Sequence, residues 1–136
     1  MKNRVLPDEL LARYVTSSRW YRRGDQTVKQ DAFIPPDSDS PELSVTRHLN
    51  LSEKDIWAVG DQITSGQNRN LHGRADVKVS SVTLHSLSVI ADPAHNNSNH
   101  ANITDWPSDK GARKAIALEI ARIAHFILNP NRISST

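Results

Sequence analysis

The sequence has 136 residues, of which 37% are hydrophobic and 24% are charged. That length accommodates one domain with a hydrophobic core and is short for two ordinary domains. The absence of cysteine excludes disulfides and thiolate chemistry and gives no indication of secretion. No apolar run is long enough to cross a membrane, and the first residues lack an apolar signal core. We therefore expect a cytoplasmic protein with no membrane partner.

The net charge of +2 is distributed unevenly along the chain. Residues 1–30 carry seven Lys and Arg against three Asp and Glu, residues 31–64 carry two against seven, and residues 65–136 carry eight against five. A basic end of this kind is compatible with binding to a phosphate backbone. It is equally compatible with pairing to the acidic middle of the same chain or of a second copy, because basic clusters alone are weak evidence.

The first half of the chain predicts two helices and two strands. Residues 7–15 read as a short helix, with a proline at its start and acidic residues in its first turn. Strands are expected over 28–34 and over 43–47, where the second alternates well. A second helix begins after Ser52, because Ser52 and Asp55 have the spacing of a capping box.

The second half predicts further strands and one long helix. The apolar residues of 74–85 change phase by one position, which indicates a bulge or two short strands, and 87–91 reads as another strand. Asp105 and Ser108 are candidate N-caps for a helix that runs to about Leu128, before Asn129-Pro130. Its apolar stripe consists of Ile116, Ile120, Ile123 and Ile127.

Helices and strands that do not alternate strictly are typical of an α+β fold. We expect a single small domain over residues 1–136, in which a mainly antiparallel sheet is packed by the long C-terminal helix. Flexible loops are expected near 35–42, 64–72 and 93–100, where turn-forming residues gather.

Four stretches of the sequence carry a resemblance: Leu43-Ser44-Val45-Thr46-Arg47, Asp55-Ile56-Trp57, Leu71-His72-Gly73-Arg74-Ala75-Asp76-Val77 and His100-Ala101-Asn102-Ile103-x-x-Trp106-Pro107-x-x-Lys110. They resemble a set of small, uncharacterised bacterial proteins, and the resemblance covers most of the chain, from about Leu10 to Ala124. No activity is established for that set, so the resemblance implies a compact bacterial domain and no particular reaction.

Two polar segments, 72–76 and 95–105, contain the residues most suited to chemistry. The asparagine-rich loop before His100 is expected to deliver His100 and Asn102 to the start of a helix, which is a natural anion site. If the strand after Arg74 ran beside the strand that precedes Asp92, both segments would lie near one another.

The leading functional hypothesis is nucleic-acid-directed, either binding or metal-independent phosphodiester cleavage. His72 and His100 could act as general base and general acid, with His95 as a substitute, and Arg74 or Arg47 would offset the charge on the phosphate. The alternative for each histidine is structural: His100 would brace a helix entry and His72 would bond a turn. Whether the protein is an enzyme stays open at this point.

Binding residues are expected in two further places. Trp20 lies among Arg22, Arg23 and other arginines, an arrangement that can stack on bases and contact phosphates, although the aromatic rings could instead pack at the domain edge. The segment before the predicted C-terminal helix adds His95, Asn102 and Trp106. The predicted binding set is therefore Arg47, His95, Asn102, Trp106, Trp20, Arg22 and Arg23, beside the catalytic candidates His72, Arg74 and His100.

Other classes of function find less support in the sequence. A metal site from His95, His100 and a nearby aspartate would have a non-standard spacing, so we expect no metal and no cofactor. Glycine-rich phosphate loops and nucleophile motifs are absent. The alternative to a nucleic-acid function is a non-enzymatic interaction module of a bacterial accessory or defence operon, in which residues 108–128 would contact a protein partner or a second copy.

Overall fold

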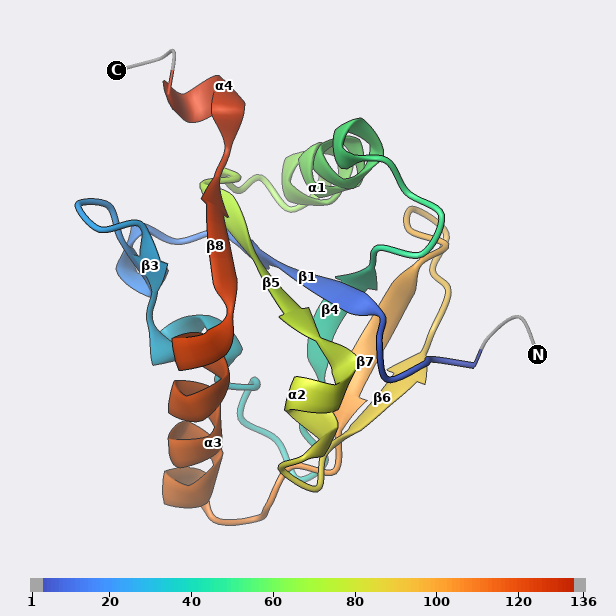
Figure 1. The fold of residues 1–136 in the computed structure, drawn as a ribbon, viewed down its shortest axis with the longest axis vertical. Helices are drawn as coiled ribbons and strands as arrows, with labels where there is room; N and C mark the ends of the chain where they lie inside the picture. Colours follow the sequence, from blue (N-terminus) through green and yellow to red (C-terminus); the bar gives the residue numbers. More distant parts are fainter. Residues whose placement is uncertain (1–3, 134–136) are drawn as a thin grey trace.

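The computed structural model describes residues 4–133, which form a six-stranded antiparallel sheet with helices on both faces (Figure 1). The expected single α+β domain is therefore confirmed. The strand order across the sheet is β6-β7-β4-β1-β5-β8. The strands are β1 (Leu10–Val15), β4 (Leu43–Arg47), β5 (Gly73–Lys78), β6 (Ser88–Ala91), β7 (His100–Thr104) and β8 (His125–Leu128).

The two faces of the sheet carry different cores, because side chains alternate along each strand. Leu11 and Val15 of β1 point into the larger core, which α3 (Lys110–Ile123) covers together with a 3₁₀ helix, η2 (Gln30–Phe33). On the opposite face, Ala12 and Tyr14 meet Ile56 of α1 (Glu53–Gly66) in a smaller cluster. The short helices α2 (Val79–Thr83) and α4 (Pro130–Ile133), the 3₁₀ helix η1 (Ser18–Trp20) and the hairpin of β2 (Tyr21–Arg22) and β3 (Thr27–Val28) complete the fold.

The helix expected over residues 7–15 is wrong, because most of that stretch is the central strand β1. It pairs with β5 over six residue pairs and with β4 on its other side. Since both of its faces are buried, its apolar residues do not show the alternation of a half-exposed strand, and a short apolar run of this kind cannot be distinguished from a helix by periodicity.

The long C-terminal helix is present but shorter at both ends than expected. Asp109 caps its first turn by accepting from the Ala112 N–H at 2.8 Å, and the helix ends at Ile123. Residues 125–128 form the edge strand β8 on β5. Gly73 makes this packing possible, since a Cβ there would lie 2.7 Å from the Phe126 ring.

Four further expectations are corrected by the fold. The expected strand over 28–34 is the end of the hairpin followed by η2, and the change of phase within 74–85 marks a transition from β5 into α2. His100 and Asn102 lie on the strand β7 and not at a helix start. The strands β5 and β6 are separated by three other strands, so the segments around Arg74 and Asp92 are not neighbours.

Where local signals were strong, the sequence prediction is confirmed. Strand β4 matches the expected residues 43–47, and β6 lies within 87–91. The capping box of α1 has the Ser52 hydroxyl accepting from the Asp55 N–H at 3.1 Å, while the Asp55 carboxylate accepts from the Ser52 N–H at 3.3 Å. Among residues 4–133, no helix has both the length and the apolar character needed to span a membrane.

Candidate functional site

The sheet separates between its two central strands, β1 and β4. Their register comprises two residue pairs, Leu11 with Arg47 and Ala12 with Thr46, whereas β1 and β5 remain paired over six. Beyond Ala12 the two strands therefore diverge. The Arg13 side chain bridges the gap, since its guanidinium donates to the Ser44 carbonyl of β4 at 3.0 Å.

A cleft of about 410 Å³ opens at this divergence. Its volume falls in the range of small-molecule and nucleotide-sized sites, roughly 300–1,000 Å³. Its walls come from β1, β4, the C-terminal end of α1 and the loop between β6 and β7. The side chains most relevant to binding are Arg13, Thr16, Trp20, Gln67, Arg69, Asn96 and His100.

Arg13 and Arg69 give the cleft its positive charge. Arg13 donates to the Ala32 and Ser44 carbonyls at 2.7 and 3.0 Å, so its hydrogen bonds go to neutral groups. Burial and the nearby charge of Arg69 lower the pKa of Arg13 to about 10, which leaves it protonated at neutral pH. Within residues 4–133 neither arginine forms an ion pair with a carboxylate, including Glu42, the acidic residue on the cleft wall. Two like charges are thus held beside one cleft without an internal counter-charge.

Trp20 supplies an aromatic surface in the same cleft. The Arg13 guanidinium lies over its ring, 5.1 Å from the ring centre. The ring is partly buried against the larger core and also lines the cleft. Arg22 and Arg23 follow it directly in the chain and are exposed on the β2–β3 hairpin.

The opposite wall is the loop between β6 and β7, which is fixed to β4 by asparagine side chains. The Asn97 amide donates to the Thr46 hydroxyl at 2.8 Å, and the Asn99 amide donates to the Arg47 carbonyl at 3.0 Å. His100 lines the cleft and its Nδ1 lies 2.8 Å from the Asp92 carbonyl. His95, on the same loop, is exposed and does not line the cleft.

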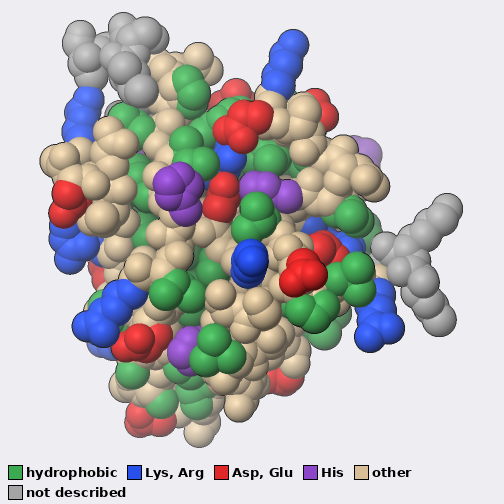
Figure 2. Space-filling view, in the orientation of Figure 1, with side chains coloured by type: hydrophobic (Ala, Val, Ile, Leu, Met, Phe, Trp, Pro, Cys, Tyr) green, Lys and Arg blue, Asp and Glu red, His purple; other side chains and the backbone are tan. Residues whose placement is uncertain are grey.

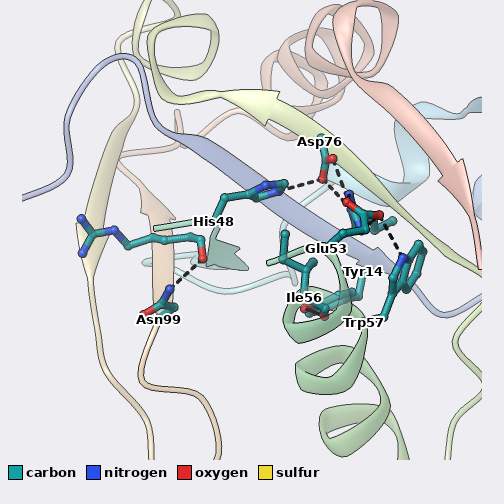
Figure 3. Close-up of polar contacts among 9 residues, drawn as sticks. Tyr14, His48, Glu53, Ile56, Trp57, Asp76 and Asn99 are labelled. Atoms are coloured by element: carbon teal, nitrogen blue, oxygen red, sulfur yellow. Dashed lines mark hydrogen bonds and ion pairs between the residues drawn. The ribbon is translucent and has the colours of Figure 1, made fainter. Parts of the chain in front are cut away.

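Arg74, a predicted catalytic residue, is enclosed by carboxylates on the α1 face of the sheet. Figure 3 shows the carboxylates of Glu53 and Asp76 and the ring of Trp57 that surround it. Its Nε donates to Asp76 at 3.0 Å, and its two terminal nitrogens donate to the Glu53 carboxylate at 2.8 and 2.9 Å. The Trp57 ring lies against the guanidinium, 4.8 Å away, and the side chain of Arg74 is 2% exposed. Such a fully paired, buried arginine is suited to holding α1 on the sheet.

Three of the predicted binding residues are likewise engaged internally. Arg47 forms a bidentate ion pair with Glu9, with both distances at 2.8 Å. The Asn102 amide donates to the Asp92 carboxylate at 3.0 Å. Trp106 is 7% exposed and its indole N–H donates to the Ile103 carbonyl, which places it in the core.

The three predicted catalytic residues are not brought together. His72 is 8% exposed and its Nδ1 lies 3.1 Å from the Tyr21 hydroxyl. Arg74 and His100 lie on strands three steps apart in the sheet order, which corresponds to roughly 14 Å at the usual strand spacing. Acid–base chemistry needs its groups within hydrogen-bond reach of one substrate atom, so this trio does not form such a centre in the arrangement described.

The predicted partner surface on residues 108–128 is divided between α3 and β8. Ala117, Ile120 and Ala121 of α3 are buried against the domain. Leu118 and Ile123 are exposed, at 36% and 55%, but at about 100° per residue they point in different directions around the helix. An interface through this helix stays a prediction.

No group of three or more His, Cys, Asp or Glu side chains in the described part of the chain could hold a metal ion. Comparisons with protein-family models, with curated proteins and with solved structures find no match to this chain. The geometry of the site is therefore the basis for assigning a function.

Sequence reasoning found two cleft residues, Trp20 and His100, and missed the two arginines. Arg13 lies in the stretch predicted to be a helix, where an arginine suggests no binding role. Arg69 lies in a polar loop that contains no motif. One signal was available: a basic residue inside the apolar run of 10–15 is unusual in a buried strand.

Proposed function

We propose that this protein binds single-stranded nucleic acid in the cleft between β1 and β4. The observation that carries the proposal is the pair Arg13 and Arg69, two cations without a carboxylate partner among the described residues, beside the ring of Trp20. A cleft that combines a charge-perturbed group with concave shape is a candidate binding site. An anionic ligand would supply the counter-charge that the protein lacks there.

The character of the wall favours a nucleotide chain over a simple anion. Positive charge along a groove together with an aromatic ring is the combination that single-strand binders use, because the charge follows the phosphates and the ring stacks on a base. Arg22 and Arg23 follow Trp20 closely in the chain and are exposed, so we count them as further candidate phosphate contacts outside the cleft. Asn96 and Gln67 add amide groups that can bond base edges.

The proposal can be tested by fluorescence anisotropy with labelled single-stranded RNA, single-stranded DNA and duplex DNA at low and high salt. Two cleft variants, Arg69→Gln and His100→Ala, are compared with two matched controls outside the cleft, Arg122→Gln and His95→Ala. We expect the wild type to prefer single strands and to bind more weakly as salt rises. Arg69→Gln should reduce the salt dependence by about one phosphate contact.

The controls decide whether the cleft is the site. Weakened binding in both cleft variants, with wild-type binding in Arg122→Gln and His95→Ala, would support the proposal. Equal weakening in all four variants would indicate diffuse attraction to a basic surface and would contradict a cleft site. Absence of binding by the wild type at low salt would exclude the proposed function.

A further inference from the structure

His100 is a titratable side chain on the cleft wall that the β6–β7 loop forms. It begins β7 and lies beside Thr46 of β4 in the register of the sheet, and both residues line the cleft. Its side chain is 19% exposed. Because the three predicted catalytic residues do not form one centre, the role of His100 has to be derived from its own contacts.

One ring nitrogen of His100 is fixed by the backbone. Nδ1 lies 2.8 Å from the Asp92 carbonyl oxygen. A carbonyl oxygen only accepts hydrogen bonds, so Nδ1 carries a proton and donates, and the neutral ring has its lone pair on Nε2. The Asp92 N–H donates to the His100 carbonyl at 2.8 Å and holds the same two residues together. The orientation and the tautomer of the ring are therefore set before a ligand binds.

The other ring nitrogen, Nε2, is on the edge of the ring that faces the cleft. Asp92, toward which Nδ1 points, does not line the cleft, whereas His100 does. Among residues 4–133 no protein group is bonded to Nε2. Since no buried side-chain nitrogen or oxygen in this part of the chain lacks a partner, Nε2 is accessible. It is a polar atom of the cleft wall that is available to a ligand.

Protonation of His100 changes the charge of the cleft wall. Thr46 and Asn97, its neighbours on β4 and in the loop, are neutral. The Asp92 carboxylate lies 3.4 Å from Nδ1 and offsets the charge of a protonated ring, whereas the two cleft arginines oppose that charge. The charged or titratable side chains in these surroundings are Asp92, just after β6, and, on the cleft walls, Arg13, Tyr14, Glu42 and Arg69.

We infer that His100 Nε2 contacts a phosphate of the bound strand, and that protonation of Nε2 makes the affinity of the cleft depend on pH. This inference rests on the proposed function, because it needs a strand in the cleft. A neutral Nε2 and a phosphate oxygen both only accept hydrogen bonds, whereas a protonated Nε2 donates a charge-assisted bond to the phosphate. Histidine side chains change their charge between about pH 5 and 8. The strand is therefore bound more tightly as the pH falls through that range, and binding takes up a proton.

The first measurement is fluorescence anisotropy with labelled single-stranded RNA and DNA from about pH 8 to about pH 5.5, at constant ionic strength. The strands carry no terminal phosphate, because a phosphate monoester itself changes charge near pH ~6. His100→Asn keeps an amide donor near the position of Nδ1 and removes Nε2. The matched control is His95→Asn, which changes an exposed histidine of the same loop outside the cleft.

We expect acid to tighten binding by the wild type and by His95→Asn about tenfold, the order of magnitude of one hydrogen bond to a charged group. His100→Asn should bind like the wild type at the alkaline end of the range and gain no affinity in acid.

The second measurement uses the wild type alone and follows the ring signals of His100 by NMR. It is needed because histidine side chains lie at separate places on the face shown in Figure 2, so a pH-dependent affinity does not by itself identify His100. Binding and protonation are reciprocal. If protonation tightens binding about tenfold, the bound strand must move the titration midpoint of His100 to higher pH by about one unit.

The outcomes separate this inference from the proposed function. A wild type that binds the strands equally well across the pH range would overturn the inference and leave the binding proposal standing. The inference would also fail if His100→Asn kept the gain in acid, if His95→Asn lost it, or if the bound strand left the His100 midpoint unmoved. A wild type that binds no strand at any pH would contradict both.

Discussion

Two arginine sites near opposite ends of α1 differ in how their charge is balanced. Arg74 is buried and paired with the carboxylates of Asp76 and Glu53, and an aromatic ring covers it. Arg13 is bonded only to carbonyls and has Arg69 as its charged neighbour. The first site is complete without a ligand, whereas the second lacks an anion.

This difference separates structural charge from charge that is available for binding. Breaking a buried pair leaves an uncompensated charge and is strongly destabilising. Removing one of two like charges relieves repulsion and should cost little. Substitution of Arg74 should therefore lower stability strongly and affect binding little. Substitution of Arg69 should weaken binding and affect stability little.

The largest expected effect is that of Arg74→Met, which removes the partner of Asp76. Asp76 is 9% exposed and would keep only its contact with His48, so we expect a loss of about 3–5 kcal/mol in the free energy of unfolding. Urea unfolding at neutral pH measures this loss. An exposed arginine such as Arg22 provides the control, and Arg22→Met should stay within about 0.5 kcal/mol of the wild type.

A double-mutant cycle tests whether the loss comes from the buried carboxylate. Asp76→Asn in the Arg74→Met background should cost much less than the sum of the two single changes, because the isolated charge is removed. Additive losses would contradict the view that Arg74 acts mainly by compensating Asp76.

Acid should weaken the ion pairs of Arg74 with Glu53 and Asp76 and leave the charges of Arg13 and Arg69 unaffected. Hydrogen bonds from Arg74 hold the pKa of Glu53 below its ordinary 4.5, and those from His48 and Arg74 outweigh burial to hold that of Asp76 below 3.8. Because both values are lower in the folded state, the carboxylates stabilise the fold fully above their ordinary values. That stability is lost as pH falls below 4.5 and through the folded-state pKa values.

Urea titrations at several acidic pH values measure this dependence. The free energy of unfolding should fall more steeply with decreasing pH in the wild type than in Arg74→Met, because the carboxylates of Arg74→Met no longer have their cationic partner. Equal slopes in the two proteins would indicate that the acid sensitivity arises elsewhere, for example at the Glu9–Arg47 pair, where a hydrogen bond from Arg47 lowers the pKa of Glu9.

The sequence predicted those parts of the fold that local chemistry decides. Ser52 and Asp55 determine the start of α1 through contacts within one turn, and the alternation of 43–47 reports a strand with two different faces. Residues 10–15 and 125–128 became strands because of partners on β5, far away in sequence. Local periodicity contains no information about such pairing, so long-range contacts overrode it.

The same distinction applies to the candidate site. The spacing of Arg74 and Asp76 on one face of a strand could be read from the sequence, but Glu53, which completes the pairing, comes from another element. Trp20 and His100 were selected by residue type and both line the cleft. The role of Arg13 depends on the divergence of β1 from β4, which only the assembled sheet reveals.

The smallest expected effect on stability is that of Arg69→Gln. It tests most directly the difference between the paired Arg74 and the unpaired arginines of the cleft. Arg69 is exposed, and the charge it faces is that of Arg13, so the free energy of unfolding should stay equal or rise by less than about 0.5 kcal/mol. Urea unfolding at low and high salt measures the change, and any gain should shrink as salt screens the repulsion. A loss of more than about 1 kcal/mol would exceed the usual worth of an exposed ion pair. It would mean that Arg69 already has a stabilising partner within the protein, and the cleft would then have no unbalanced charge to offer a phosphate.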